Sequence, residues 1–164
     1  MRVYLPTTMA GLRAALAGGS LDATTGFAVT PALREWYVEG DLEELEYAAT
    51  SAAARASLRM LGDGSPRRVV LAAELPDGRV NPTGTPAGED RAAVRVDGPV
   101  ELSLVESALV DDPDAGDDVR AAVAALPGAD AGDDDATFVV DGVEDHELGW
   151  YAAQELSVLV ALES

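Results

Sequence analysis

The sequence predicts an α+β fold, arranged as a two-layer sandwich with a mixed or mainly antiparallel sheet and about five helices. Segments with helical spacing of apolar residues alternate along the chain with short extended segments. Consecutive extended segments occupy the middle of the chain, which is typical of antiparallel pairing. The chain has 164 residues, of which 48% are apolar. This is enough to bury one core, so we expect a single globular domain over residues 1–164.

The first predicted elements are a strand and a capped helix. Residues 3–5 predict a short strand that ends at Pro6. Thr7 or Thr8 can begin a helix, because a threonine side chain at the N-cap accepts a hydrogen bond from the first turn. The glycine pair at 18–19 is typical of a helix end.

One short strand and two helices are predicted next. Residues 27–29 favour an extended segment, and the Thr-Pro pair at 30–31 is typical of a helix start. The clearest helix runs from Asp41 to about Leu61. Asp41 and Glu44 have the spacing of a capping box, and acidic residues in a first turn interact favourably with the helix dipole.

The middle of the chain predicts three strands. They cover residues 68–75, 92–96 and about 104–110. Residues 76–91 are rich in proline, glycine and aspartate, and we expect a mobile hairpin loop there.

The C-terminal third predicts two helices. The first ends at residue 126, because a Pro-Gly pair follows it. Residues 127–136 are then expected to be an acidic loop, and residues 137–140 favour an extended segment. Residues 143–162 predict the final helix.

Composition excludes several kinds of chemistry. The chain has no cysteine and no lysine, and His146 is its only histidine. Disulfides, thiolate nucleophiles, cysteine zinc sites, lysine Schiff bases and the phosphate-binding P-loop are therefore excluded. We expect no cofactor and assign no metal site.

The sequence shows neither a signal peptide nor an apolar stretch of membrane-spanning length, so we expect a cytoplasmic protein that does not bind membranes. The formal charge is −19, which argues against direct binding of nucleic acid or of anionic membranes.

The negative charge is concentrated in one stretch. Residues 97–147 hold 16 acidic residues and only one basic residue, Arg120. Nine of those carboxylates lie in the runs 111–118 and 130–135. Neither run has the ligand spacing of an EF-hand loop, so only weak cation binding is expected there. We expect instead a protein partner with a basic surface. Mimicry of DNA is a separate hypothesis that follows from charge alone.

An aromatic and acidic motif covers residues 35–47. Trp36, Tyr37 and Tyr47 lie there among five glutamates and one aspartate. Aromatic side chains beside carboxylates are typical of surfaces that bind cationic groups or partner proteins. The alternative is that Trp36 and Tyr37 pack into the core and join two helices.

The C-terminal segment holds the other candidate residues. His146 and Glu147 match the first two residues of the zinc-protease motif HExxH, but Trp150 occupies the position of the second histidine. His146 is a candidate for proton transfer with Glu147 or Asp145 as its carboxylate, and Trp150 and Tyr151 are candidate binding residues. The alternative is a surface histidine stacked on Trp150.

Several strings resemble a family of uncharacterised proteins of similar size from high-GC bacteria. The resemblance depends on MRVYLP, on FAVTPALREWY followed by GDLEELEYAA, and on VEDHELGWYAAQEL. It spans most of the chain and implies one complete domain. It implies no activity, cofactor or catalytic residue.

Two hypotheses for function follow. The first is a non-catalytic protein-binding module. The second is a small-ligand binder, or an enzyme using carboxylates and histidine, built on His146, Glu147 and Trp150 of the predicted C-terminal helix. If Trp36 and Trp150 meet around a concave site, ligand binding is favoured, whereas burial of both favours plain packing.

Overall fold

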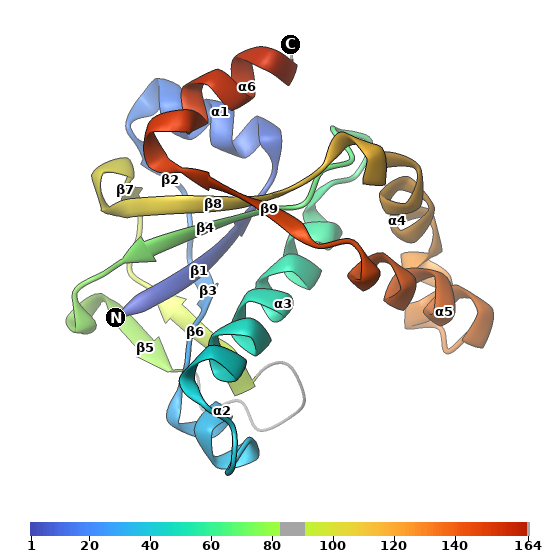
Figure 1. Ribbon diagram of the computed structural model, residues 1–164, viewed down its shortest axis with the longest axis horizontal. Helices are drawn as coiled ribbons and strands as arrows, with labels where there is room; N and C mark the ends of the chain where they lie inside the picture. The colour runs from blue at the N-terminus through green and yellow to red at the C-terminus, as the bar shows by residue number, and fades with distance from the viewer. Residues whose placement is uncertain (83–90, 164) are drawn as a thin grey trace.

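The computed structural model describes residues 1–82 and 91–163. Its centre is a seven-stranded antiparallel sheet with the strand order β5-β6-β3-β1-β4-β8-β9, and a second sheet pairs β2 with β7 (Figure 1). The strands are β1 Arg2–Thr7, β2 Ser20–Leu21, β3 Thr25–Phe27, β4 Val69–Glu74, β5 Val80–Pro82, β6 Ala93–Val96, β7 Val100–Glu101, β8 Val105–Asp111 and β9 Leu148–Ala152. The α-helices of the described residues are α1 Met9–Gly18, α2 Pro31–Trp36, α3 Leu42–Met60, α4 Gly116–Asp130, α5 Asp134–Gly142 and α6 Leu156–Glu163. The α+β class and the antiparallel sheet are confirmed.

Both faces of the sheet are buried, because residues of its central strands alternate between two cores. Val3 and Leu5 of β1 point into a core that also contains residues of α1 and α6, whereas Tyr4 points into a core formed with α3. Figure 1 shows α1 and α6 together at one end of the sheet, with α3 and α2 lower in the view. The predicted two-layer packing corresponds to the sheet and α3. The helices α1 and α6 cover the other face of the sheet.

The predicted helix caps of the N-terminal half are confirmed. The Thr8 side chain accepts a hydrogen bond from Gly11 N–H, and Gly19 ends α1 in the left-handed conformation at φ +88°. Thr30 caps α2 through Leu33 N–H, and Asp41 caps α3 through Glu44 N–H. β1, however, continues through Pro6 to Thr7 and does not end at Pro6.

The hydroxyl of Ser57 attaches α3 to the sheet. Ser57 is buried in α3, donates to Thr7 O at 2.7 Å and accepts from Val69 N–H at 2.9 Å. This one side chain therefore connects α3 to β1 and β4.

The acidic loop predicted at residues 127–136 is wrong. α4 continues through Pro127 to Asp130, and Asp133 caps α5, which begins at Asp134. A β-carbon added at Gly128 would lie 2.9 Å from Cβ of Ala136, so the glycine permits close packing of α4 on α5. The Pro-Gly pair therefore serves helix packing and does not stop the helix.

The extended segment predicted at residues 137–140 is also wrong, because these residues belong to α5. The single helix predicted over residues 143–162 is replaced by a 3-10 turn at Val143–Asp145, strand β9, a second 3-10 turn and α6. The physical reason is long-range pairing. β9 joins the sheet beside β8, with Leu109 opposite Trp150 and Asp111 opposite Leu148.

The loop predicted at residues 76–91 is partly structured. A 3-10 turn at Asp77–Arg79 leads into β5, which pairs with β6. The rest of that prediction, residues 83–90, lies outside the described residues.

Candidate functional site

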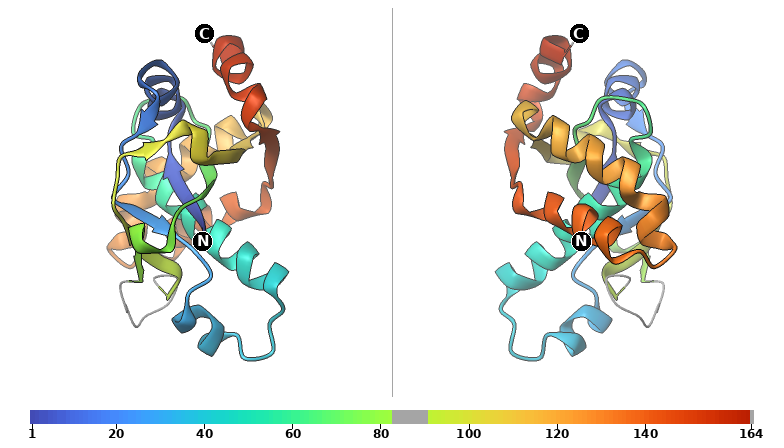
Figure 2. Two further views of the ribbon diagram at one scale, coloured as in Figure 1. Left: turned by 90° about the vertical axis from the view of Figure 1, so that its left-hand side faces the viewer. Right: turned by 90° about the vertical axis from the view of Figure 1, so that its right-hand side faces the viewer.

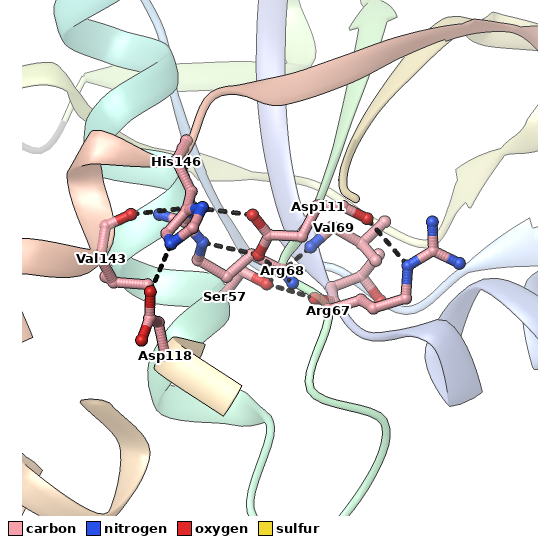
Figure 3. Close-up of polar contacts among 9 residues, drawn as sticks. Ser57, Arg67, Arg68, Val69, Asp111, Asp118, Val143 and His146 are labelled. Carbon is pink, nitrogen blue, oxygen red and sulfur yellow. Dashed lines mark hydrogen bonds and ion pairs between the residues drawn. The ribbon is translucent and has the colours of Figure 1, made fainter. Parts of the chain in front are cut away.

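A buried ion pair positions the segment that leads into β9 (Figure 3). Arg68 and Asp111 are 3% and 0% exposed, and their side chains form two parallel hydrogen bonds of 2.8 Å. The Arg68 backbone N–H donates a third bond to the same carboxylate, also at 2.8 Å. Arg68 then donates to Val143 O at 3.3 Å and to His146 O at 3.0 Å. The pair therefore joins β4 and β8 to the chain entering β9.

An open groove lies between α3 and β9, on the face of the sheet that α3 covers only in part. Its volume is about 1240 Å³. The floor comes from the sheet: Tyr4, Ala72, Ser107 and Leu109. α2 and α3 supply one side, and the segment from Glu144 to Trp150 supplies the other.

Four of the five predicted aromatic binding residues line this groove. Trp36 and Tyr37 come from the end of α2, Tyr47 from α3 and Trp150 from β9. Trp36 is 59% exposed, Tyr47 is 68% exposed and Trp150 is 64% exposed. The two tryptophans are therefore not core residues, and both line one concave site.

Tyr151 does not belong to this groove. Successive strand residues point to opposite faces, so Tyr151 packs against the core of the α1 and α6 side and lines a second cavity beside α6. The strand places Trp150 and Tyr151 on opposite faces of the sheet, which the helix expected there did not predict.

The groove carries an excess of carboxylates. Six acidic side chains line it against three arginines: Asp41, Glu43, Glu44, Glu46, Glu144 and Glu147, against Arg2, Arg55 and Arg68. Each arginine already has a carboxylate partner, since Arg2 pairs with Glu106, Arg55 with Glu144 and Arg68 with Asp111.

Five of the six groove carboxylates form no ion pair within the described part of the chain. Asp41 caps α3, and the other four are Glu43, Glu44, Glu46 and Glu147. The unneutralised charge of the groove is therefore negative, and carboxylates beside exposed aromatic rings favour a cationic occupant.

The groove contains a buried phenol on its floor and an aromatic ring that already lies against a cation. Burial raises the pKa of Tyr4 above its ordinary value, and the nearby Glu46 carboxylate raises it further, so the phenol on the floor stays neutral at neutral pH. The guanidinium of Arg91 lies over the Trp36 ring, 3.9 Å from its centroid. The chain itself thus places a cation on one of the groove aromatics.

His146 and Glu147 also line the groove, but the carboxylate partner of His146 is not Glu147 or Asp145 as predicted. Nε2 of His146 lies 2.7 Å from Oδ2 of Asp118, a residue of α4 (Figure 3). The prediction was wrong because it placed His146 on a helix. The turn before β9 instead directs the imidazole toward α4.

Sequence reasoning missed the floor of the groove and the residues that position it. Arg2, Tyr4, Ser107 and Leu109 come from strands that meet only through pairing in the sheet. Arg68 was missed as well: it directly precedes β4 and is buried. A signal for it was present, since an arginine next to a buried apolar strand needs an acidic partner if it is buried too.

Metal-binding clusters and membrane-spanning helices are absent from the described residues. Over residues 1–82 and 91–163, no group of three or more histidine, aspartate or glutamate side chains is arranged to hold a metal ion. The helices found in the same residues include none whose length and hydropathy would suit a bilayer crossing.

Comparison with known proteins identifies the family alone. No curated protein and no solved structure matches the chain. One family model, described as a family of unknown function (DUF6912), matches residues 1–160. The chain therefore belongs to the DUF6912 family, as the resemblance of its sequence motifs indicated.

Proposed function

We propose that this protein is a non-catalytic binding module that holds a basic segment of a partner protein in the groove between α3 and β9. The observation that carries the proposal is that Trp36, Tyr47 and Trp150, all exposed, line the same groove as glutamates that form no ion pair. Arginine and lysine side chains stack on aromatic rings and pair with carboxylates, so both features select the same occupant.

The size of the groove favours a peptide segment over a small molecule. Pockets for small ligands usually have volumes of roughly 300–1,000 Å³ and enclose most of the ligand. This groove has a volume of about 1240 Å³ and is open to solvent. Exposed aromatic side chains with polar residues around them are typical of protein interfaces, and the carboxylates favour a basic segment as the occupant.

Peptide binding can be measured without an added reporter on the protein. Trp36 and Trp150 are the only two tryptophans of the chain, and both line the groove. We expect a short peptide in which arginine alternates with threonine to change the intrinsic tryptophan fluorescence in a saturable manner. The same peptide with glutamate in place of arginine should cause no change.

Variants locate the binding surface. Trp36→Ala and Trp150→Ala should each weaken binding of a fluorescently labelled arginine peptide on the order of tenfold, measured by anisotropy. Phe138→Ala is the matched control, because Phe138 is an aromatic residue of α5 that is 80% exposed and lies outside the groove. Equal loss in Phe138→Ala, or equal binding of the glutamate peptide, would contradict the proposal.

Charge is tested separately. We expect a triple variant of the groove to weaken arginine-peptide binding: Glu43→Gln, Glu46→Gln and Glu147→Gln combined. The comparison is the double variant Asp134→Asn with Asp135→Asn, which removes carboxylates of the acidic run outside the groove and should weaken binding less. If instead free arginine amide binds as tightly as the peptide, the groove is a small-ligand site and the partner proposal is wrong.

A further inference from the structure

β9 is the last strand of the seven-stranded sheet, and one of its sides has no strand beside it among residues 1–82 and 91–163. Figure 2 shows the strand at the outer margin of the molecule. Sheet edges are usually protected by proline, by a charged residue, by a bulge or by short length. The opposite edge strand, β5, has three residues and includes Pro82. β9 has five residues, Leu148–Ala152, with no proline and no charged side chain.

The direction of the backbone groups in β9 follows from its neighbours. Asp111 N–H donates to Arg68 O at 3.1 Å, so the backbone groups of Asp111 point toward β4. Backbone groups alternate along an antiparallel strand, and those of Ala108 and Val110 therefore point toward β9. Their partners are Tyr151 and Gly149. By the same alternation, the N–H and C=O groups of residues 148, 150 and 152 point away from the sheet.

A second contact supports this assignment independently. Ala152 N–H donates to the side chain of Glu155 at 2.9 Å. Ala152 lies opposite Ser107 in the register. The bond to Glu155 shows that the Ala152 N–H is directed away from β8, which is the direction that the alternation predicts. Glu155 thus occupies one outward N–H of the edge. Within the part of the chain that the structure describes, the outward N–H groups of Leu148 and Trp150 have no such partner and remain for another strand.

The same two residues face the groove. The side chains of Leu148 and Trp150 both line it. A peptide strand added beside β9 would extend the floor of the groove, and every second side chain of that peptide would lie on the groove face. Its backbone would pair with Leu148 and Trp150 while these side chains meet the aromatic and acidic wall.

We propose that the partner segment binds as an extended strand added to the free edge of β9, with basic side chains at alternate positions directed into the groove. This proposal rests on the proposed function, because it takes the same groove and the same basic occupant. Backbone hydrogen bonds to β9 supply affinity independent of sequence, and the groove selects the basic side chains.

Charge favours this partner over a second copy of the chain. Acidic residues flank β9 in the sequence, and β9 itself carries no basic residue. Three of them precede the strand and one follows it: Glu144, Asp145, Glu147 and Glu155. Pairing of two β9 edges would bring these carboxylates together from both copies. Like charges at a contact are unfavourable, whereas a basic segment meets them with the opposite charge.

Amide hydrogen exchange measured by NMR on the full chain tests the edge directly, with the arginine-threonine peptide as the probe. We expect exchange at Leu148 and Trp150 to slow by on the order of tenfold or more on addition of the peptide, because their N–H groups become paired. Gly149 and Tyr151 already pair with β8 and should change less. Asn81 of β5, whose N–H points toward β6 by the same alternation, is a paired amide far from β9 and should not change.

The outcomes separate the two proposals. If the peptide changes tryptophan fluorescence and Trp150→Ala weakens binding, but exchange at Leu148 and Trp150 stays unchanged, the strand pairing is wrong and the proposed function stands. If no basic peptide binds, the proposed function itself fails. Concentration-dependent dimerisation without peptide, with slowed exchange at Leu148 and Trp150, would show that a second copy occupies the edge and would overturn this inference.

Peptide backbone methylation gives a second measurement that leaves the protein unchanged. N-methyl groups on one set of alternate peptide residues would remove the hydrogen bonds to β9, and those on the other set would face solvent. We expect one set to weaken binding on the order of tenfold and the other to have little effect. An equal effect of both sets would contradict strand addition.

Discussion

The Asp111 carboxylate receives three hydrogen bonds from Arg68, and Arg68 donates onward to two carbonyl groups of the chain before β9. Both residues are almost fully buried, so neither charge can be solvated if its partner is removed. This side-chain pair therefore helps to position His146 and the groove wall that follows it, together with the pairing of β9 with β8.

Asp111→Asn should destabilise the fold by about 3–5 kcal/mol, because the Arg68 charge would stay buried without a counter-charge. Urea unfolding followed by circular dichroism measures the change. Asp117→Asn is the matched control: Asp117 is an exposed carboxylate of α4, and its change should stay within about 0.5 kcal/mol. The double variant Arg68→Met with Asp111→Leu should recover much of the loss. A small effect of Asp111→Asn alone would contradict this account of the pair.

At the scale of elements, α4 and α5 form a helical pair at one end of α3. Apolar contacts join them through a third buried cluster that includes Leu58, Val119 and Val143. On the surface, Arg59 of α3 donates two hydrogen bonds to Asp130 at the end of α4, at 3.0 and 2.8 Å. These hydrogen bonds from Arg59 lower the pKa of Asp130 below its ordinary value of 3.8.

The lowered pKa of Asp130 predicts the pH dependence of this contact. A carboxylate whose folded-state pKa lies below its unfolded-state value contributes stability above the unfolded-state pKa, and loses it as pH falls through the folded-state pKa. We expect wild type to be slightly more stable than Asp130→Asn at neutral pH, with the difference vanishing in acid below the ordinary aspartate range. Urea unfolding of both proteins over a pH series measures it. A difference that grows in acid would contradict the assignment.

The helices and strands also show which parts of the structure a local sequence pattern can predict. The caps at Thr8, Thr30 and Asp41 were predicted because capping depends on residues only three positions apart. The segment 143–162 was assigned wrongly, because its helical spacing is a local property and its place beside β8 is not. An aromatic segment that can adopt either structure becomes a strand where a sheet edge can pair with it.

For the whole molecule, the net charge of −19 opposes compaction. We expect the urea midpoint of unfolding to rise as sodium chloride is added to a low-salt buffer, because screening weakens the repulsion among carboxylates. Choline chloride at equal ionic strength should give the same rise. A rise with sodium alone would indicate specific cation binding at the runs 111–118 and 130–135, and a fall with both salts would indicate that ion pairs outweigh repulsion.

The sequence by itself determined the fold class, the first three helices with their caps and the concentration of acidic charge, and it indicated four of the aromatic residues that line the groove as candidates. These follow from local spacing and composition, which act within a few residues along the chain. Only the tertiary structure decided that Trp36 and Trp150 line one groove, that Tyr151 faces the other side, and that β9 ends the sheet. Those facts depend on pairing between β8 and β9 and on the buried Arg68 and Asp111 pair, whose members lie far apart in the sequence.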